Sequence, residues 1–243
     1  MIEIGRVEAI FRYPVKSMRG APMQCVELGW HGLAGDRRLA FRRINERGGF
    51  PWLIASKVAE LLLYTPRTES AEAGALPTHV ITPDGEDFPI YSEELAAEIG
   101  RRYGSPIEMM HMRDGIFDDG SVSLITTDTV DEIGRLVAQN PDVRRFRPNI
   151  LVRPIKSSPF QEEVWLGGSL SFGEGIGAAS VSVTLRDARC AVINFDPDSA
   201  KSSPEILKSV VRANANNAGV YGTVTRTGQV AVGQPVFLKP ADA

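Results

Sequence analysis

Residues 4–12, IGRVEAIFR, and residues 22–28, PMQCVEL, set the fold that we expect of this chain. Both stretches are short, carry several apolar residues such as Ile, Val and Phe, and are typical of β-strands. Glycines mark the turns between such runs, at Gly32, Gly35, Gly48 and Gly49. This rhythm predicts a β-barrel or a β-sandwich in the first third of the chain.

The rest of the chain combines further strands with a few helices. Ser92 and two acidic residues after it predict a helix over 93–103. A second helix is predicted over 127–138 with Thr127 as its N-cap, and a third over 205–213 with Ser203 as its N-cap. Further strands are predicted at 121–125, 147–153, 169–172, 178–186, 189–195, 220–226 and 229–238. The expected class is mainly β with some α, an α+β arrangement.

Residues 113–121, RDGIFDDGS, gather turn-forming residues between two apolar runs. We therefore expect a domain boundary there, between residues 1–115 and residues 116–243. A chain of 243 residues is long enough for two modest domains, each with its own core.

The composition is that of an ordinary globular protein, with 43% hydrophobic and 23% charged residues. A net charge of −3 argues against a surface devoted to nucleic acid, so an anion site would have to be local. No signal segment and no membrane span are predicted. The two cysteines, Cys25 and Cys190, fit a reducing cytoplasm and exclude a disulfide framework. We expect a cytoplasmic monomer with no nucleic-acid or membrane partner.

Cys190 is the first candidate for chemistry. A lone cysteine after an apolar strand is more often an inert core residue, but Arg186 and Arg189 beside it favour the reactive thiolate. A nucleophilic cysteine normally needs a histidine base, and the sequence gives no sign of one paired with Cys190. Metal ligation is the better hypothesis, because a soft thiolate suits a thiophilic metal.

Three basic segments could form an anion site. Lys16 and Ser17 follow the first strand, Arg37 follows Asp36, and residues 144–149 read RRFRPN. A solvated turn or solvated charge is the default interpretation of each segment alone. Lysine and arginine with serine and asparagine donors are nevertheless the set that binds a phosphate. Dinucleotide loops, Walker-type loops and His-Glu-x-x-His zinc helices are absent from the sequence, which disfavours common nucleotide and zinc chemistry.

Several motifs occur together in a specific order. They are Tyr13-Pro14-Val15-Lys16-Ser17, Gly35-Asp36-Arg37, Phe146-Arg147-Pro148-Asn149, Arg189-Cys190 with Asp196-Pro197, and Gly219-Val220-Tyr221 with Val232-Gly233. In combination they resemble MOSC proteins with an N-terminal MOSC β-barrel, including the amidoxime-reducing component family of molybdenum enzymes. The resemblance covers nearly the whole chain. It implies an N-terminal MOSC β-barrel domain at 1–115 and a MOSC β-barrel domain at 116–243.

The resemblance also implies a molybdenum cofactor, that is, molybdopterin with the metal held by the Cys190 thiolate. Pyridoxal phosphate binding is a further property attached to the family. By resemblance, Cys190 is both the metal ligand and a catalytic residue. The implied cofactor-binding residues are Lys16, Ser17, Arg37, Thr126, Thr127, Arg147, Asn149, Arg189 and Cys190. Lys16, Ser17 and Arg37 match the positions that hold the pterin phosphate.

The chain departs from the amidoxime-reducing branch around Cys190. That branch usually has a second cysteine three residues before the ligand and a threonine-rich run after it. This chain has Asp187 and then residues 191–195, AVINF. Asp187 is a catalytic candidate that could relay a proton near the metal, although simple pairing with Arg186 or Arg189 is favoured.

Three functions follow from these observations. The favoured one is a molybdenum-cofactor oxidoreductase that reduces N-hydroxylated or related N-oxygenated small molecules. Since the sequence has no flavin loop, cysteine cluster or haem motif, its electrons would come from a separate redox protein. The alternative is a non-catalytic carrier of cofactor or of sulfur on Cys190. A β-rich binding protein with a buried cysteine is the third.

Overall fold

The computed structural model describes residues 1–70, 72 and 74–241. The strands are β1 (Ile2–Arg12), β2 (Ala21–Met23), β3 (Cys25–Gly29), β4 (Gly32–Leu33), β5 (Leu39–Arg43), β6 (Thr65–Arg67), β7 (His79–Ile81), β8 (Asp87–Pro89), β9 (Ile107–His111), β10 (Val122–Thr126), β11 (Ile150–Pro154), β12 (Ser169–Phe172), β13 (Ala179–Ala188), β14 (Asn217–Arg226), β15 (Gly228–Ala231) and β16 (Pro235–Lys239). The α-helices are α1 (Glu93–Tyr103), α2 (Thr127–Val137) and α3 (Glu205–Asn214), and short 3-10 helices are η1 (Ala59–Leu63), η2 (Val143–Phe146), η3 (Gln161–Trp165) and η4 (Ala191–Asn194).

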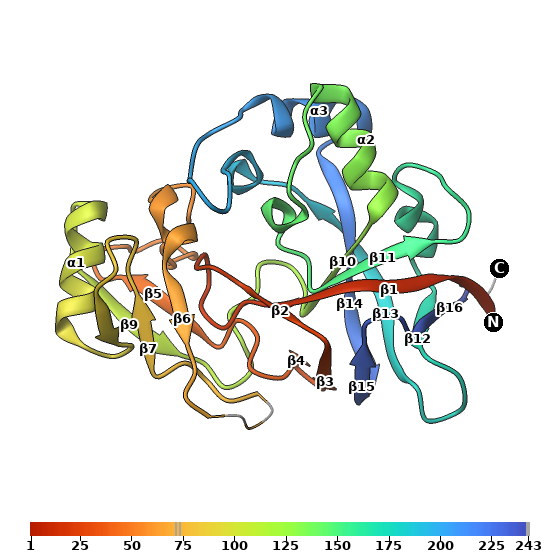
Figure 1. Cartoon of the computed structure of the whole chain (residues 1–243), viewed down its shortest axis with the longest axis horizontal. Coiled ribbons are helices and arrows are strands. Elements are labelled where there is room, and N and C mark those ends of the chain that lie inside the picture. Colours follow the sequence, from red (N-terminus) through yellow and green to blue (C-terminus); the bar gives the residue numbers. More distant parts are fainter. Residues whose placement is uncertain (71, 73, 242–243) are drawn as a thin grey trace.

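A closed barrel of seven strands forms the right-hand part of the molecule in Figure 1. Its strands follow the order β11-β10-β14-β13-β12-β16-β1, and β1 closes the circle by pairing with both β16 and β11. The parallel pair β10 and β11 is joined through helix α2, as a parallel connection requires. The inward side chains form one apolar core, which includes Val7, Leu124, Val152, Val181 and Val220.

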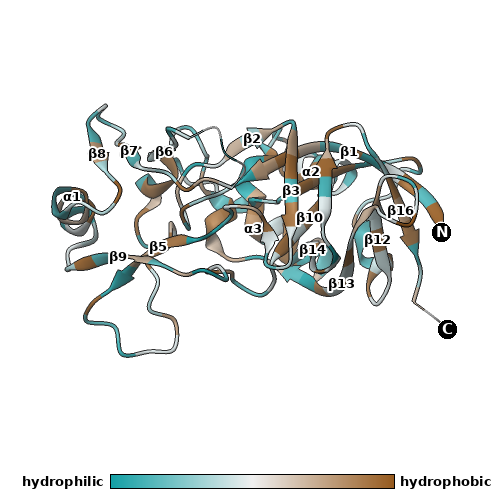
Figure 2. Ribbon diagram, turned by 90° about the horizontal axis from the view of Figure 1, so that it is seen from below, coloured by the Kyte–Doolittle hydropathy of each residue, from teal (hydrophilic) through white to brown (hydrophobic). Residues whose placement is uncertain are grey.

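A smaller lobe lies at the other end of the molecule. It contains the pair β5–β9, the three-stranded sheet β6–β7–β8, and helix α1, which packs on them (Figure 1). Its own core includes Leu39, Phe41, Leu61, Tyr64 and Leu95. Figure 2 shows the two parts end to end, with α1 at one extreme and both chain termini at the barrel end.

Helix α1 forms where the sequence predicted it. The Ser92 side chain accepts a hydrogen bond from the Leu95 amide at 3.2 Å, and Glu93 and Glu94 favour the positive end of the helix dipole. Gly104 ends the helix with a left-handed φ of 82°, a conformation that costs glycine little. No helix in the described part of the chain is long and apolar enough to cross a bilayer.

The predicted class, mainly β with some α and a β-barrel, is confirmed. Strand pairs nevertheless connect the two sides of the predicted boundary near residue 115. Strand β1 belongs to the barrel built by residues 122–239, because it pairs with β11 and β16. Strand β3 also pairs with β15. In the described residues of the lobe the strands form two small open sheets.

Three local predictions need correction. Residues 189–195 are not a strand, because β13 ends at Ala188 and the chain turns into η4. The N-cap of α2 is Thr126 rather than Thr127, since the Thr126 hydroxyl accepts the Thr129 amide at 3.2 Å. The N-cap of α3 is Pro204 rather than Ser203. Thr126 and Thr127 have the same capping chemistry, so propensity alone does not fix where α2 begins, and α3 begins after Pro204 without a side-chain cap.

Candidate functional site

A cavity of about 360 Å³ is lined by residues of both the barrel and the lobe. Its walls combine cationic, acidic, aromatic and apolar side chains with one thiol. They are Lys16, Ser17, Arg37, Phe50, Ile54, Asp118, Asp119, Ser123, Arg145, Phe146, Arg147, Asp187, Ala188, Arg189, Cys190, Val192, Ile193 and Tyr221. Residues that are far apart in the sequence, from Lys16 to Tyr221, therefore line one site. The lining contains five cationic side chains against three carboxylates, which favours an anionic ligand.

Lys16 enters the cavity from the turn that follows β1. The Lys16 amide donates to the Leu39 carbonyl oxygen at 2.7 Å, and Ser17 adopts a left-handed φ of 66°, so the chain bends sharply here. Only 6% of Lys16 is exposed, and burial lowers the pKa of its ammonium group. The Lys16 ammonium donates to an Asp118 carboxylate oxygen at 2.7 Å. The Ser17 hydroxyl accepts the Ala55 amide at 3.1 Å.

Arg37 is held from behind by two buried polar residues. Its guanidinium donates to the Asp36 carboxylate at 2.5 Å and to the Asn149 side-chain oxygen at 3.1 Å. Asp36 is fully buried and also accepts the Tyr13 amide at 2.6 Å. Burial acts to lower the pKa of Arg37, but the Asp36 carboxylate more than offsets it and raises the pKa above its ordinary value. The Arg37 charge is thus fixed at this wall.

Arg147 supplies an unused donor. One terminal nitrogen, Nη1, donates to the Met18 carbonyl oxygen at 2.8 Å, whereas Nη2 is buried and has no hydrogen-bond partner within the described residues. Its guanidinium lies over the Tyr13 ring, 4.2 Å from the centroid. Burial lowers the pKa of Arg147 to about 10, so it stays charged at neutral pH. Because an unpaired buried N–H is costly, this nitrogen is a donor that an anion in the cavity could satisfy.

Cys190 also lines the cavity, two residues after the end of β13. Both cysteines of the chain are free and exposed, and Cys190 is the N-cap residue of η4. Arg189 does not offer its guanidinium to a ligand, because it donates to the carbonyl oxygens of Phe146 at 2.7 Å and Ala218 at 2.6 Å. Arg189 therefore anchors the backbone that carries the thiol.

Asp187 is buried in the cavity wall with 2% exposure. It pairs with Arg189 at 2.9 Å and accepts the Ser123 hydroxyl at 2.8 Å. Burial raises the pKa of Asp187 to about 6, although Arg189 and Ser123 act to lower it. Arg186 pairs elsewhere, with Glu163 at 2.9 Å. Of the two pairings considered for Asp187, the one with Arg189 is present.

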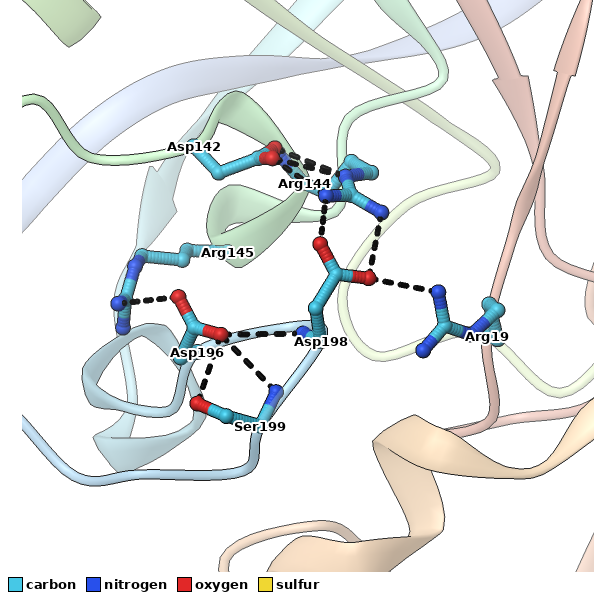
Figure 3. A network of polar contacts seen from close by, with 7 residues as sticks. All are labelled: Arg19, Asp142, Arg144, Arg145, Asp196, Asp198 and Ser199. Carbon is cyan, nitrogen blue, oxygen red and sulfur yellow. Dashed lines mark hydrogen bonds and ion pairs between the residues drawn. The ribbon is translucent and has the colours of Figure 1, made fainter. Parts of the chain in front are cut away.

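A surface network holds the loop that follows Cys190 (Figure 3). The Asp198 carboxylate accepts hydrogen bonds from Arg144 and, at 2.7 Å, from Arg19. Asp196 pairs with Arg145 at 2.9 Å and also accepts the Ser199 hydroxyl at 2.9 Å. We call the part of the lining formed by Lys16, Arg37 and Arg147 the anion wall. Because Arg19 follows the turn that carries Lys16, this network connects the loop after Cys190 to the anion wall.

The structure brings together seven of the predicted site residues on one cavity: Lys16, Ser17, Arg37, Arg147, Asp187, Arg189 and Cys190. Asn149 lies behind the wall and supports Arg37. Thr126 and Thr127 lie away from the lining, where Thr126 caps α2 and donates to Glu162 at 2.9 Å. Ser123 carries no local signal in the sequence, Tyr221 enters the prediction only through its motif, and Asp118 enters it only as part of a linker.

A metal at Cys190 would need ligands from outside the protein. Within the described residues no group of three or more His, Cys, Asp and Glu side chains could hold a metal ion. A bound cofactor that brings its own ligands would satisfy this requirement. A phosphate on the same cofactor would meet the cationic wall.

The sequence of this chain matches the MOSC domain over residues 109–237, more than half of its length. The structure is similar to that of the YuaD protein from Bacillus subtilis, with a TM-score of 0.54, 13% identity, and coverage of 98% of this chain and 97% of that one. It also matches YiiM from Geobacillus stearothermophilus, with a TM-score of 0.38, 17% identity, and coverage of 50% and 55%. No curated protein matches the sequence. The chain belongs to the MOSC domain family, in which the domain is associated with binding of the molybdenum cofactor.

Proposed function

We propose that this protein binds the molybdenum cofactor in the cavity and reduces N-hydroxylated or related N-oxygenated small molecules. One observation carries the proposal: a free thiol and an unpaired buried arginine N–H lie on the walls of the same cavity. The first suits a thiophilic metal and the second suits a phosphate.

The residues present fit the two ends of the cofactor. Lys16, Arg37 and Arg147 would hold the phosphate, because each is a cation on the cavity wall and Arg147 has a free donor. Cys190 would hold the metal, and the dithiolene sulfurs of the pterin would complete a ligand set that the protein does not provide. The cavity volume of about 360 Å³ lies in the ordinary range for small-molecule sites.

When bound, the cofactor would supply a redox-active metal for removal of the substrate oxygen atom. Reduction of an N–OH group to N–H with release of water consumes two protons and two electrons. Asp187 lines the cavity and has a pKa raised to about 6, so its carboxyl oxygen could hold one of these protons near neutral pH. Ser123, hydrogen-bonded to Asp187 and also on the wall, extends the same proton path. The electrons would come from an external redox protein.

The test is metal and pterin analysis of the full chain, expressed with molybdate in a host that makes the cofactor. We expect near-stoichiometric molybdenum and pterin, and reduction of an aryl amidoxime with a reduced viologen as electron source. Cys190→Ser should keep the fold and lose turnover, whereas Cys25→Ser, which removes the other exposed thiol, should behave as wild type. Lys16→Ala and Arg37→Ala should retain less cofactor, because each removes a charge-assisted contact.

Three results would count against this function. Absence of molybdenum and pterin, in a host shown to load another molybdenum enzyme, would refute cofactor binding. Retained turnover in a loaded Cys190→Ser variant would refute the role of the thiolate. Cofactor or cyanide-labile sulfur without any turnover would instead support the carrier function, which the exposure of Cys190 also allows.

A further inference from the structure

At the anion wall, the ammonium group of Lys16 is already paired with an acidic side chain of the protein. The Lys16 ammonium lies 2.7 Å from an Asp118 carboxylate oxygen and 3.4 Å from the Ile116 carbonyl oxygen. Asp118 lines the same cavity as Lys16 and Arg147. These two hydrogen bonds use two of the three ammonium N–H groups, and a phosphate at Lys16 would meet the Asp118 carboxylate as a like charge at the same cation.

The two members of this ion pair are unequally fixed. The Lys16 side chain is 5% exposed, whereas the Asp118 side chain is 56% exposed. Moving Lys16 would carry its charge through a packed interior, but moving Asp118 would return a carboxylate to water at little cost. If the pair opens, Asp118 is the side chain that leaves.

The Asp118 carboxylate stays close to Lys16 even when the ion pair is open, because the neighbouring backbone is fixed. Ile116, two residues earlier, is 3% exposed, and its amide donates to the Arg37 carbonyl oxygen at 2.7 Å. The carboxylate is thus tethered by two residues to the cavity wall itself. A tether this short gives an effective concentration of at least about millimolar, so Asp118 competes with a free anion without being consumed.

We propose that Asp118 is an internal competitor that sets the affinity of the anion wall, and that a phosphate group binds Lys16 only by displacing it. The proposal rests on the proposed function for the identity of the natural ligand, which would be the cofactor phosphate. The competition itself concerns any phosphate group. The apparent affinity for phosphate equals the intrinsic affinity multiplied by the fraction of molecules in which Lys16 is free of Asp118.

The first experiment is a titration with inorganic phosphate of the full chain, produced in a host that cannot make the pterin. We expect Asp118→Asn to bind phosphate at least about fivefold more tightly than wild type, because the neutral amide competes poorly for an ammonium. Asp114→Asn is the matched control. It removes the same charge from the same loop, but Asp114 pairs with His31 instead and lies outside the cavity lining.

The outcomes separate competition from a general charge effect. Equal gains in Asp118→Asn and Asp114→Asn would show a general charge effect and overturn the proposal. Unchanged or weaker phosphate binding in Asp118→Asn would overturn it as well. A gain confined to Asp118→Asn supports it, and circular dichroism of both variants would verify that they are folded.

The second experiment observes the displacement directly. In the carbon-13 NMR spectrum, the Asp118 carboxyl resonance is assigned as the one missing from Asp118→Asn. Its pKa is held below the ordinary value by Lys16, although burial opposes this. Saturating phosphate should raise that pKa toward the value of a free carboxyl group, and an unchanged titration curve would refute displacement. Both measurements use metal-free protein, so they can succeed even if no reductase activity is found.

Discussion

The two walls of the cavity are built in opposite ways. At the anion wall, Arg37 is held by buried Asp36 and Asn149, and Arg147 is stacked on buried Tyr13. At the thiol wall, the part of the lining around Cys190, the thiol is exposed and the loop that follows it is held largely by ion pairs at the surface (Figure 3). This fold therefore preorganises the cationic side chains and leaves the Cys190 thiol accessible. Variants on the two walls should therefore fail in different ways.

The largest effect is expected from Asp36→Ala. This change leaves the Arg37 charge buried beside an unpaired Tyr13 amide, which should lower the free energy of unfolding by about 3–5 kcal/mol. Urea denaturation at neutral pH measures it. Glu205→Ala, which breaks an exposed pair with Lys208, should leave the denaturation midpoint nearly unchanged and serves as the control.

Cys190→Ser is the corresponding stability test at the thiol wall. Because the thiol is exposed, its replacement by a hydroxyl should change the free energy of unfolding by less than about 0.5 kcal/mol. If Asp36→Ala and Cys190→Ser proved equally stable, the anion wall would not be the rigid part of the site.

The second effect is a pH dependence that Asp187 imposes. Its pKa is raised by burial from 3.8 to about 6, so its contribution to stability is fully present below pH 3.8 and is lost as the pH rises through 6. Asp187→Asn cannot ionise and escapes this loss. Between pH 4.5 and pH 7.5, its stability relative to wild type should therefore increase by about 2 kcal/mol.

Chemical denaturation of both proteins at the two pH values provides the measurement. Glu163→Gln is the control, since Glu163 faces Arg186 outside the cavity. A gap between Asp187→Asn and wild type that does not change with pH would mean that Asp187 ionises normally in the folded protein.

Much of the site could be predicted from sequence because its chemistry lies in short local motifs. Lys16, Ser17 and Arg37 each adjoin a strand, and Arg147 and Cys190 lie in motifs of recognisable order. The strand rhythm of the first third predicted a barrel or a sandwich; β1 does join the barrel, whereas β5 to β9 form two small sheets of the lobe. Closure of the barrel by β1 could not be predicted from the sequence. The pairing between residues 2–12 and residues 150–154 depends on long-range contacts that no local pattern records.

Site residues that lie outside any recognisable motif could not be predicted from the sequence. Asp118 lies in a run of turn formers, so its sequence context indicates only a linker. Its contact with Lys16 joins residues that are 102 positions apart. The strand expected at 189–195 is absent because β13 ends at Ala188 and the chain closes the 3-10 turn η4, in which the Ile193 amide donates to the Cys190 carbonyl oxygen at 3.3 Å.

A small effect on stability is expected from Asp198→Asn at the thiol wall. Asp198 joins Arg19 to Arg144, but its side chain is 54% exposed and Arg144 keeps its second partner, Asp142. The free energy of unfolding should therefore fall by no more than about 1 kcal/mol.

The informative measurement on Asp198→Asn is local amide hydrogen exchange. Residues 190–199 should exchange faster, while the barrel strands should not change, because the tie to Arg19 is lost only at this loop. In high salt, wild type should approach the variant, since exposed ion pairs are screened. If exchange at 190–199 is unaffected, the partly buried pair between Asp196 and Arg145 fixes the loop instead. The thiol would then be positioned from the barrel side alone, and the two walls would be coupled only through the barrel.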